Sequence, residues 1–230
     1  MHAGATDPAL LRRARARRLR GLYALTPETP DTEALVTAVA AALDGGAAAV
    51  QYRSKHLAAA LRAEQARALA RVLAARGGVY VVNDDPALAR DVGADGVHLG
   101  EDDASIDSAR EILGPDRLIG VSCYDDLARA RDAVARGADY IAFGSFFSSP
   151  TKPHARRADP TLLSRAQTLG VPVVAIGGIT SANAESLISA GADAVAVISD
   201  VFGHDDPGAI RVAADAFARL FHRVTRAHAT

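Results

Sequence analysis

The chain has 230 residues, with 26 lysines and arginines, 27 aspartates and glutamates, and 49% apolar residues. This composition is ordinary for a soluble globular protein, and the near-zero net charge excludes a general electrostatic attraction to nucleic acid or to a membrane surface. The single cysteine, Cys123, excludes an internal disulfide framework and fits a reducing compartment. No apolar stretch is long enough to span a membrane, and the first residues lack the apolar core of a signal peptide. We therefore expect a cytoplasmic protein.

The first twenty residues contain a local excess of positive charge. A nucleic-acid-binding arm is one interpretation, but leucines and alanines alternate with the arginines at helical spacing, which favours a solvated helix packed over one end of the domain. We assign residues 1–20 to this N-terminal basic helix. Its arginines are Arg12, Arg13, Arg15, Arg17, Arg18 and Arg20.

From residue 21 onward, short apolar runs alternate with helical patterns. The expected strands are 22–26, 47–51, 79–82, 96–99, 118–122, 140–143, 172–176 and 194–198. The expected helices are 32–45, 57–75, 86–92, 105–113, 127–136, 160–169, 181–190 and 207–221. Gly-Ala-Asp ends a helical pattern at 93–95, 137–139 and 191–193, which supports quasi-repeated units and indicates no chemistry by itself.

Alternation of this kind predicts a parallel sheet with right-handed crossovers, and eight units in about 200 residues match a closed (β/α)₈ TIM barrel. An open doubly wound sheet fits less well, because no strand is followed by a dinucleotide-type glycine fingerprint. We expect one barrel domain over residues 21–224 and a tail at 225–230.

Carboxylates follow two neighbouring expected strands. Asp84 and Asp85 follow the third strand, and Glu101, Asp102 and Asp103 follow the fourth. Carboxyl ends of adjacent parallel strands meet at one edge, so oxygen ligands for a hard cation, Mg²⁺ holding a phosphate, are predicted there. Capping of the following helices is the alternative for each single aspartate.

Other strand ends add cations, hydroxyls and glycines. Arg53 and Lys55 follow the second strand, and Ser148, Ser149, Thr151 and Lys152 lie in the irregular segment 144–158, which we interpret as a phosphate-closing lid or, alternatively, a surface loop. Gly177 and Gly178 with Ser199 match the usual phosphate-binding position of such barrels. No nucleophile–base pair is evident, and His98 and Cys123 are interpreted as packed residues.

With these residues assembled, the chain from about Gly21 to Phe221 resembles the thiamine phosphate synthase family. The resemblance rests on Gln51-x-Arg53-x-Lys55, Val82-Asn83-Asp84, Gly96-Val97-His98-Leu99-Gly100 with Asp103, Gly120-Val121-Ser122, Ser149-Pro150-Thr151-Lys152, Ile176-Gly177-Gly178-Ile179 and Val197-Ile198-Ser199. It implies a transferase that joins hydroxymethylpyrimidine diphosphate to a thiazole phosphate, or its carboxylated form, and releases pyrophosphate, with CO₂ from the carboxylated form.

The resemblance also implies roles for individual residues. Asp84 and Asp103 would ligate Mg²⁺, which binds the diphosphate. The pyrimidine substrate would be held by Gln51, Arg53, Lys55, Asn83, Ser122 and Lys152, of which Arg53, Lys55, Ser122 and Lys152 are the expected catalytic residues. The thiazole substrate would be held by Ser149, Thr151, Gly178, Ile198 and Ser199. The expected partners are these small molecules, and a homodimer stays open as an assembly.

The chain departs from the family pattern at four positions, which are Tyr52, Ser54, Glu101 and Ser149. Glu101 adds a negative charge beside the metal position, so the ligand could be Glu101, Asp102 or Asp103. The alternatives are a thiazole tautomerase, another phosphate-binding barrel enzyme such as a sugar-phosphate isomerase, and a non-catalytic binder of thiamine precursors. Neither the tautomerase nor the isomerase would need paired carboxylates for a metal.

Overall fold

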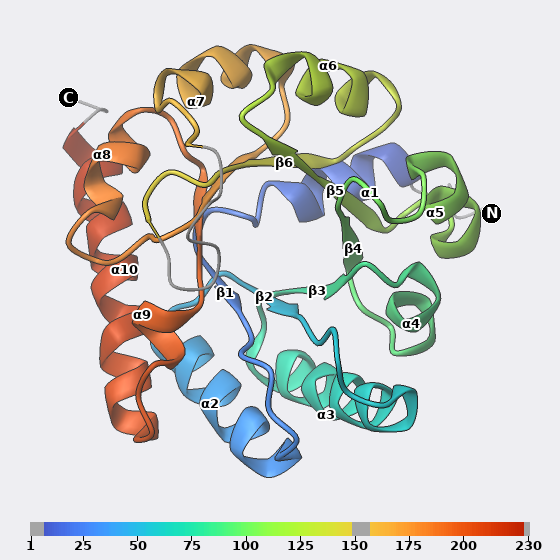
Figure 1. The fold of residues 1–230 in the computed structure, drawn as a ribbon, viewed down its shortest axis with the longest axis vertical. Coiled ribbons are helices and arrows are strands. Elements are labelled where there is room, and N and C mark those ends of the chain that lie inside the picture. Colours follow the sequence, from blue (N-terminus) through green and yellow to red (C-terminus); the bar gives the residue numbers. More distant parts are fainter. Residues whose placement is uncertain (1–6, 149–156, 228–230) are drawn as a thin grey trace, which may run out of the picture.

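The computed structural model describes residues 7–148 and 157–227. Within these ranges eight parallel strands form a closed barrel in sequence order, which confirms the predicted TIM barrel. Figure 1 shows the strands around a central axis with helices forming an outer ring. The strands are β1 (Gly21–Leu25), β2 (Ala49–Tyr52), β3 (Val79–Asn83), β4 (Gly96–Leu99), β5 (Leu118–Tyr124), β6 (Tyr140–Phe143), β7 (Val173–Ile176) and β8 (Ala194–Val197).

The helices follow the predicted alternation, with differences mainly at their ends. They are α1 (Pro8–Ala16), α2 (Thr32–Asp44), α3 (Ala59–Arg76), α4 (Pro86–Asp91), α5 (Ile106–Leu113), α6 (Leu127–Ala135), α7 (Thr161–Ala166) with the 3₁₀ turn η1 (Gln167–Leu169), α8 (Ala184–Ser189), α9 (Ser199–Phe202) and α10 (Pro207–Ala227). The short α9 was not predicted, and α10 continues six residues beyond the expected end at Phe221. None of the helices in the described ranges is both long and apolar enough to span a membrane.

Strand side chains alternate between two apolar layers, as expected from the period of two in a β-strand. In β1, Leu22 and Ala24 belong to the layer between strands and helices, whereas Tyr23 and Leu25 belong to a second cluster inside the barrel. Cys123 lies in the outer layer, and burial raises the pKa of its thiol to about 12, so the prediction that it is a packing residue is confirmed. The strand ends are therefore held on a rigid, filled barrel.

Residues 7–20 of the N-terminal basic segment lie at one end of this barrel, and the helix within them, α1, covers Pro8–Ala16 and not the whole predicted range. Ala16 and Leu19 are buried in the inner cluster, at the end where the strands begin. Figure 1 shows α1 lying across the barrel near β5. The segment is fixed by ion pairs of Arg12 with Asp139 at 3.0 Å, Arg15 with Asp95 at 3.6 Å and Arg20 with Asp193 at 3.2 Å. These three arginines thus bind carboxylates of the same protein.

The same three carboxylates belong to the repeated Gly-Ala-Asp tripeptide, which gives the repeat a structural role. Each accepts a hydrogen bond from a backbone N–H of the preceding strand: Asp95 from Tyr80 at 2.9 Å, Asp139 from Ile119 at 2.9 Å and Asp193 from Val173 at 3.0 Å. In the sequence the repeat indicates only the ends of helices. In the structure its aspartates join neighbouring strands at the end of the barrel opposite the predicted site.

Candidate active site

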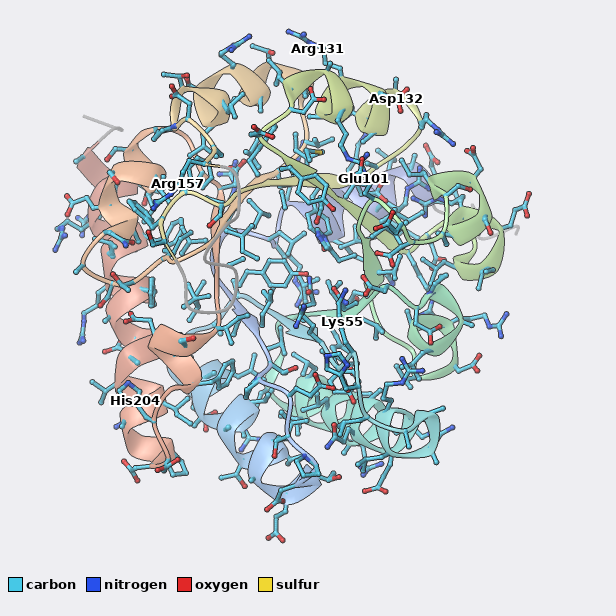
Figure 2. All side chains as sticks on the ribbon, in the orientation of Figure 1. Lys55, Glu101, Arg131, Asp132, Arg157 and His204 are labelled. Carbon is cyan, nitrogen blue, oxygen red and sulfur yellow. The ribbon has the colours of Figure 1, made fainter. Side chains whose placement is uncertain are left out.

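The predicted site residues within the described ranges lie where the strands end. Lys55, Asn83, Asp84 and Asp103 follow or end β2, β3 and β4, and Ser122 lies in β5. Figure 2 shows Lys55 and Glu101 inside the ring of helices, whereas Arg131 and Asp132 extend from the outer side of α6. The carboxyl ends of the strands form the face where TIM barrels bind ligands.

Two carboxylates and a lysine meet between β3 and β4. The Lys55 Nζ lies 3.3 Å from Asp84 Oδ2. The pKa of the Asp84 carboxyl is raised by partial burial, by its hydrogen bond with Asp103 and by the negative charge of Asp103, while Lys55 opposes these effects. Two like charges held together in this way would be stabilised by a bound cation.

The local backbone sets the position of this pair. Asp84 has φ 63°, a left-handed conformation that aspartate and asparagine adopt more readily than most residues, and its N–H donates to the His98 carbonyl of β4 at 2.8 Å. Asp103 Oδ2 accepts a hydrogen bond from the Gly100 N–H at 2.6 Å. Asp85 instead caps α4 by accepting from the Leu88 N–H at 2.9 Å, so the capping alternative holds for Asp85.

The structure distinguishes among the three acidic residues after β4. Asp103 is half-buried and interacts with Asp84, whereas Glu101 and Asp102 are exposed. A Glu101 carboxylate oxygen lies 3.6 Å from Arg129 on α6. The carboxylate that faces Asp84 is thus that of Asp103, whereas the Glu101 carboxylate lies near the Arg129 guanidinium.

The pair fits Mg²⁺ but offers it few protein ligands. Among the described residues no group of three or more His, Cys, Asp or Glu side chains could hold a metal ion. Mg²⁺ in phosphate-binding sites is commonly held by one or two carboxylates and completes its octahedron with water and substrate phosphates. The carboxylates of Asp84 and Asp103 match this pattern of few protein ligands, and the raised pKa of Asp84 reflects how close the two groups lie.

A network of hydrogen bonds crosses the barrel interior beneath the carboxyl ends of the strands, which we call the mouth of the barrel. Gln51 Nε2 donates to Tyr23 Oη at 2.9 Å, and Tyr23 Oη lies 2.9 Å from Tyr140 Oη. Tyr140 Oη lies 3.1 Å from His98 Nδ1, and His98 Nε2 lies 2.9 Å from Ser122 Oγ. Two predicted substrate-binding residues, Gln51 and Ser122, are therefore connected through three side chains from β1, β6 and β4.

The side chains of this hydrogen-bond network are neutral at physiological pH. Burial lowers the pKa of His98 to about 4, with the Asp103 charge acting in the opposite direction. Burial raises the pKa values of Tyr23 and Tyr140 well above the ordinary range. The interpretation of His98 as a packed, hydrogen-bonded histidine is confirmed, and a neutral imidazole can accept from one neighbour while donating to the other.

An irregularity in β5 shapes the mouth next to Ser122. The β5–β6 register shifts between Ser122 and Tyr124, and Tyr124 has φ 53°. The Arg129 Nε donates to the Ser122 carbonyl at 2.9 Å, and its guanidinium lies 5.6 Å from the centre of the Tyr124 ring. Bulges of this kind occur next to active sites, where they redirect side chains.

The loops after β7 and β8 form the other side of the mouth. Gly177 and Gly178 have φ values of 107° and 64°. A Cβ on Gly177 would lie 2.1 Å from Ser145 Oγ, and one on Gly178 would lie 2.3 Å from the Ser148 carbonyl oxygen. Both glycines are thus needed for two loops to approach each other closely. Next to them Ile198 is half-buried against the inner cluster, and the exposed Ser199 opens α9.

Some predicted site residues lie outside the described ranges or outside these clusters. Ser149, Thr151 and Lys152 lie outside the described residues, and the lid prediction falls largely on the same segment. Arg53 is half-buried, and its backbone N–H donates to Thr26 Oγ1 at 2.9 Å.

The protein-family comparison gives a match for most of the chain. The family described as "Thiamine monophosphate synthase" matches residues 22–201. The chain belongs to this family. A thiamine-phosphate synthase of Thiobacillus denitrificans is 57% identical over 202 residues, covering 87% of this chain and 94% of the relative. One of Methylobacillus flagellatus is 51% identical over 208 residues, covering 90% and 95%.

A solved structure agrees with this family. Thiamine phosphate pyrophosphorylase from Pyrococcus furiosus superposes with a TM-score of 0.79 at 34% identity, covering 91% of this chain and 98% of that one. The resemblance inferred from the sequence is confirmed, and with it the class of transferase.

Sequence reasoning missed four residues of this region: Tyr23 and Tyr140 lie in the barrel interior beneath the mouth, and Tyr124 and Arg129 lie beside Ser122. Tyr23 and Tyr140 were treated only as strand residues, although a phenol in an inward-facing strand position signals a buried hydrogen bond. Arg129 and Tyr124 follow Ser122 closely, but their contact depends on the β5 irregularity, which the sequence does not indicate.

Proposed function

We propose that this chain catalyses the formation of thiamine phosphate from hydroxymethylpyrimidine diphosphate and a thiazole phosphate. The bond from the pyrimidine methylene carbon to the diphosphate oxygen breaks, and pyrophosphate leaves with the electron pair. A bond forms between that carbon and the thiazole nitrogen, and the carboxylated thiazole also loses CO₂. The main support is the Asp84–Asp103 pair with Lys55 at the mouth of a barrel that belongs to this family.

The diphosphate would bind over the carboxylate pair. Mg²⁺ bound there would neutralise charge that develops on the departing pyrophosphate. Lys55 lies 3.3 Å from Asp84, so its ammonium is in position to move from that carboxylate to a phosphate oxygen once the cation is present. Arg53 on the same segment and Lys152 are proposed to supply further positive charge.

The pyrimidine would bind nearer the barrel axis, over the hydrogen-bond network of Gln51, Tyr23, Tyr140, His98 and Ser122. Gln51 and Ser122 are held by Tyr23 and His98, respectively, and this fixes the direction of their polar groups. The aminopyrimidine can stabilise positive charge at its methylene carbon, so pyrophosphate departure can precede attack by the thiazole. No enzyme nucleophile is needed in this reaction, and a neutral, packed His98 is consistent with such a role.

The thiazole phosphate would bind on the side of β7 and β8. Gly178, Ile198 and Ser199 bring backbone groups to that side of the mouth, and Ser149 and Thr151 are proposed to complete it. The cytoplasmic location and the homodimer considered from the sequence stay predictions.

The decisive experiment mixes the two substrates and measures pyrophosphate release with and without Mg²⁺. We expect release only with Mg²⁺, and we expect Asp84→Ala to abolish it while circular dichroism shows an intact fold. Asp102→Ala is the matched control, because Asp102 is exposed and does not face Asp84. Near-normal release by Asp84→Ala would refute the metal assignment, and no release by the unaltered protein would refute the function.

The alternatives from the sequence have less support. The relatives and the solved structure reported above are synthases or pyrophosphorylases, which gives no support to a tautomerase or a non-catalytic binder. A tautomerase or a sugar-phosphate isomerase would also leave the like-charged pair at Asp84 and Asp103 without a purpose, whereas the pyrophosphate-release assay separates a synthase from a non-catalytic binder.

A further inference from the structure

A cavity of about 360 Å³ opens beside the carboxylate pair. Its walls come from the β2–α3 connection, from α3 and from the β3–α4 connection. They comprise Ser54, Lys55, Arg62, Asn83, Asp84, Asp85 and Pro86. Three of these residues are already proposed to bind the diphosphate or its metal, but Arg62 has no role so far.

Arg62 lies in the first turn of α3. Among the described residues its guanidinium forms no ion pair, and its buried Nε has no hydrogen-bond partner. By contrast, Arg76 at the other end of the same helix forms an ion pair with Asp44 at 3.0 Å. A buried N–H without an acceptor costs free energy, so Arg62 calls for an acceptor that the described residues do not supply.

The charges around the cavity indicate an anion as that acceptor. Lys55 and Arg62 bring positive charge to the β2–α3 side. On the opposite side Asp85 is occupied in capping α4, and Asp84 interacts with Asp103 and Lys55. A divalent cation bound between Asp84 and Asp103 would leave the two basic side chains facing the cavity as donors.

We infer that Arg62 is a further substrate-binding residue, which contacts the outer phosphate of the diphosphate group. The inference rests on the proposed function and extends its diphosphate site outward from the strand ends to α3. The phosphate bonded to the pyrimidine methylene would lie over the strand ends, and the cavity continues from Asp84 toward the helix. A guanidinium can donate two parallel hydrogen bonds to a phosphate, whereas Lys55 acts as a point charge.

The test measures binding of inorganic pyrophosphate in Mg²⁺ buffer by titration calorimetry, and separately the steady-state kinetics with both substrates. Arg62→Gln removes the charge, Arg62→Lys retains it without the planar fork, and Arg71→Gln is the matched control on the exposed face of α3. We expect Arg62→Gln to weaken pyrophosphate binding and to raise the KM for the pyrimidine diphosphate by about tenfold or more, since a charge-assisted hydrogen bond is lost.

The pattern across substrates and variants separates a binding role from a structural one. We expect the KM for the thiazole phosphate to stay unchanged in Arg62→Gln, Arg62→Lys to recover part of the pyrophosphate affinity, and Arg71→Gln to match the unaltered protein. Should Arg62→Gln fail to fold, Arg62→Lys is compared with Arg71→Gln, and equal pyrophosphate affinity refutes the inference. Equal affinity of Arg62→Gln and the unaltered protein also refutes it.

The same measurements distinguish failure of this inference from failure of the proposed function. If the unaltered protein condenses the substrates and Arg62→Gln does so equally well at low diphosphate concentration, only the role of Arg62 is wrong. If the unaltered protein releases no pyrophosphate from the substrates, the proposed function is wrong, whatever the variants bind.

Discussion

The buried His98 predicts a loss of stability in mild acid. In the folded protein the pKa of His98 is lowered from 6.5 to about 4 by burial, while in the unfolded chain it returns to its ordinary value. Between these two values the unfolded state binds more protons, so the free energy of unfolding falls as the pH falls. The stabilising contribution is fully present above the unfolded pKa and is lost as the pH drops through the folded one.

The size of the effect follows from the pKa difference. One pKa unit corresponds to about 1.4 kcal/mol, so the shift from 6.5 to about 4 amounts to about 3 kcal/mol in total. By linkage, about 2 kcal/mol of this is already lost at about pH 5. For a chain of this size, 2 kcal/mol corresponds to about 4–8 °C in Tm.

The assay is urea unfolding at about pH 7 and about pH 5, in buffer with a chelator, for the unaltered protein and for His98→Gln. Glutamine cannot titrate but can still hydrogen-bond Ser122, so the variant should lose about 1 kcal/mol at pH 7 through its missing bond to Tyr140. All other side chains are the same in both proteins, so the difference between their pH dependences isolates His98. If both proteins lose the same free energy between the two pH values, the burial of a neutral His98 is refuted.

Three further outcomes are expected. Asp84→Asn should abolish Mg²⁺-dependent pyrophosphate release yet keep or raise the Tm, because it removes a repulsion with Asp103 and asparagine tolerates φ 63°; an activity assay and a thermal melt check this. Gly120→Ala should cost about 1–3 kcal/mol in urea unfolding, because its Cβ would lie 2.0 Å from the Tyr140 ring in a filled interior. Asp139→Asn should lower the free energy of unfolding by about 2 kcal/mol, since its carboxylate accepts from Ile119 and two arginines; an unchanged urea midpoint would contradict this.

The barrel and the acidic side of its mouth could be predicted from the sequence because both depend on local patterns. Period-two runs that end in polar residues identify buried strands, and closure of eight such units brings their ends together. Asp84 and Asp103 follow adjacent strands, so their proximity follows from strand order alone. The resemblance implies Asp103 but leaves Glu101 and Asp102 open. The structure favours Asp103, which is half-buried beside Asp84, whereas Glu101 lies 3.6 Å from Arg129 on a helix beyond the next strand.

The hydrogen-bond network inside the barrel could not be predicted, because it depends on how the strands are aligned relative to one another. Tyr23 and Tyr140 are 117 residues apart, and their hydroxyls meet only because β1 and β6 both turn these side chains inward at the same height. Nothing local distinguishes an inward-facing tyrosine from an outward-facing one in a strand that is buried on both faces. The sequence could at most have indicated that both phenols need partners.

The two ends of the barrel use aspartates in opposite ways. Where the strands begin, the carboxylate of Asp139 accepts from a backbone N–H and pairs with Arg12 at 3.0 Å and Arg110 at 2.7 Å, so its charge is compensated within the fold. Where the strands end, Asp84 is held beside Asp103 on a left-handed backbone, and the pKa of Asp84 is raised. At the first end one carboxylate is paired with two arginines, whereas at the second end Asp84 and Asp103 share one lysine, Lys55, and this excess of negative charge lies where we propose that a cation binds. It follows that removing a carboxylate charge should destabilise the protein at Asp139 but abolish activity without loss of stability at Asp84, and equal losses of stability at both positions would refute this division.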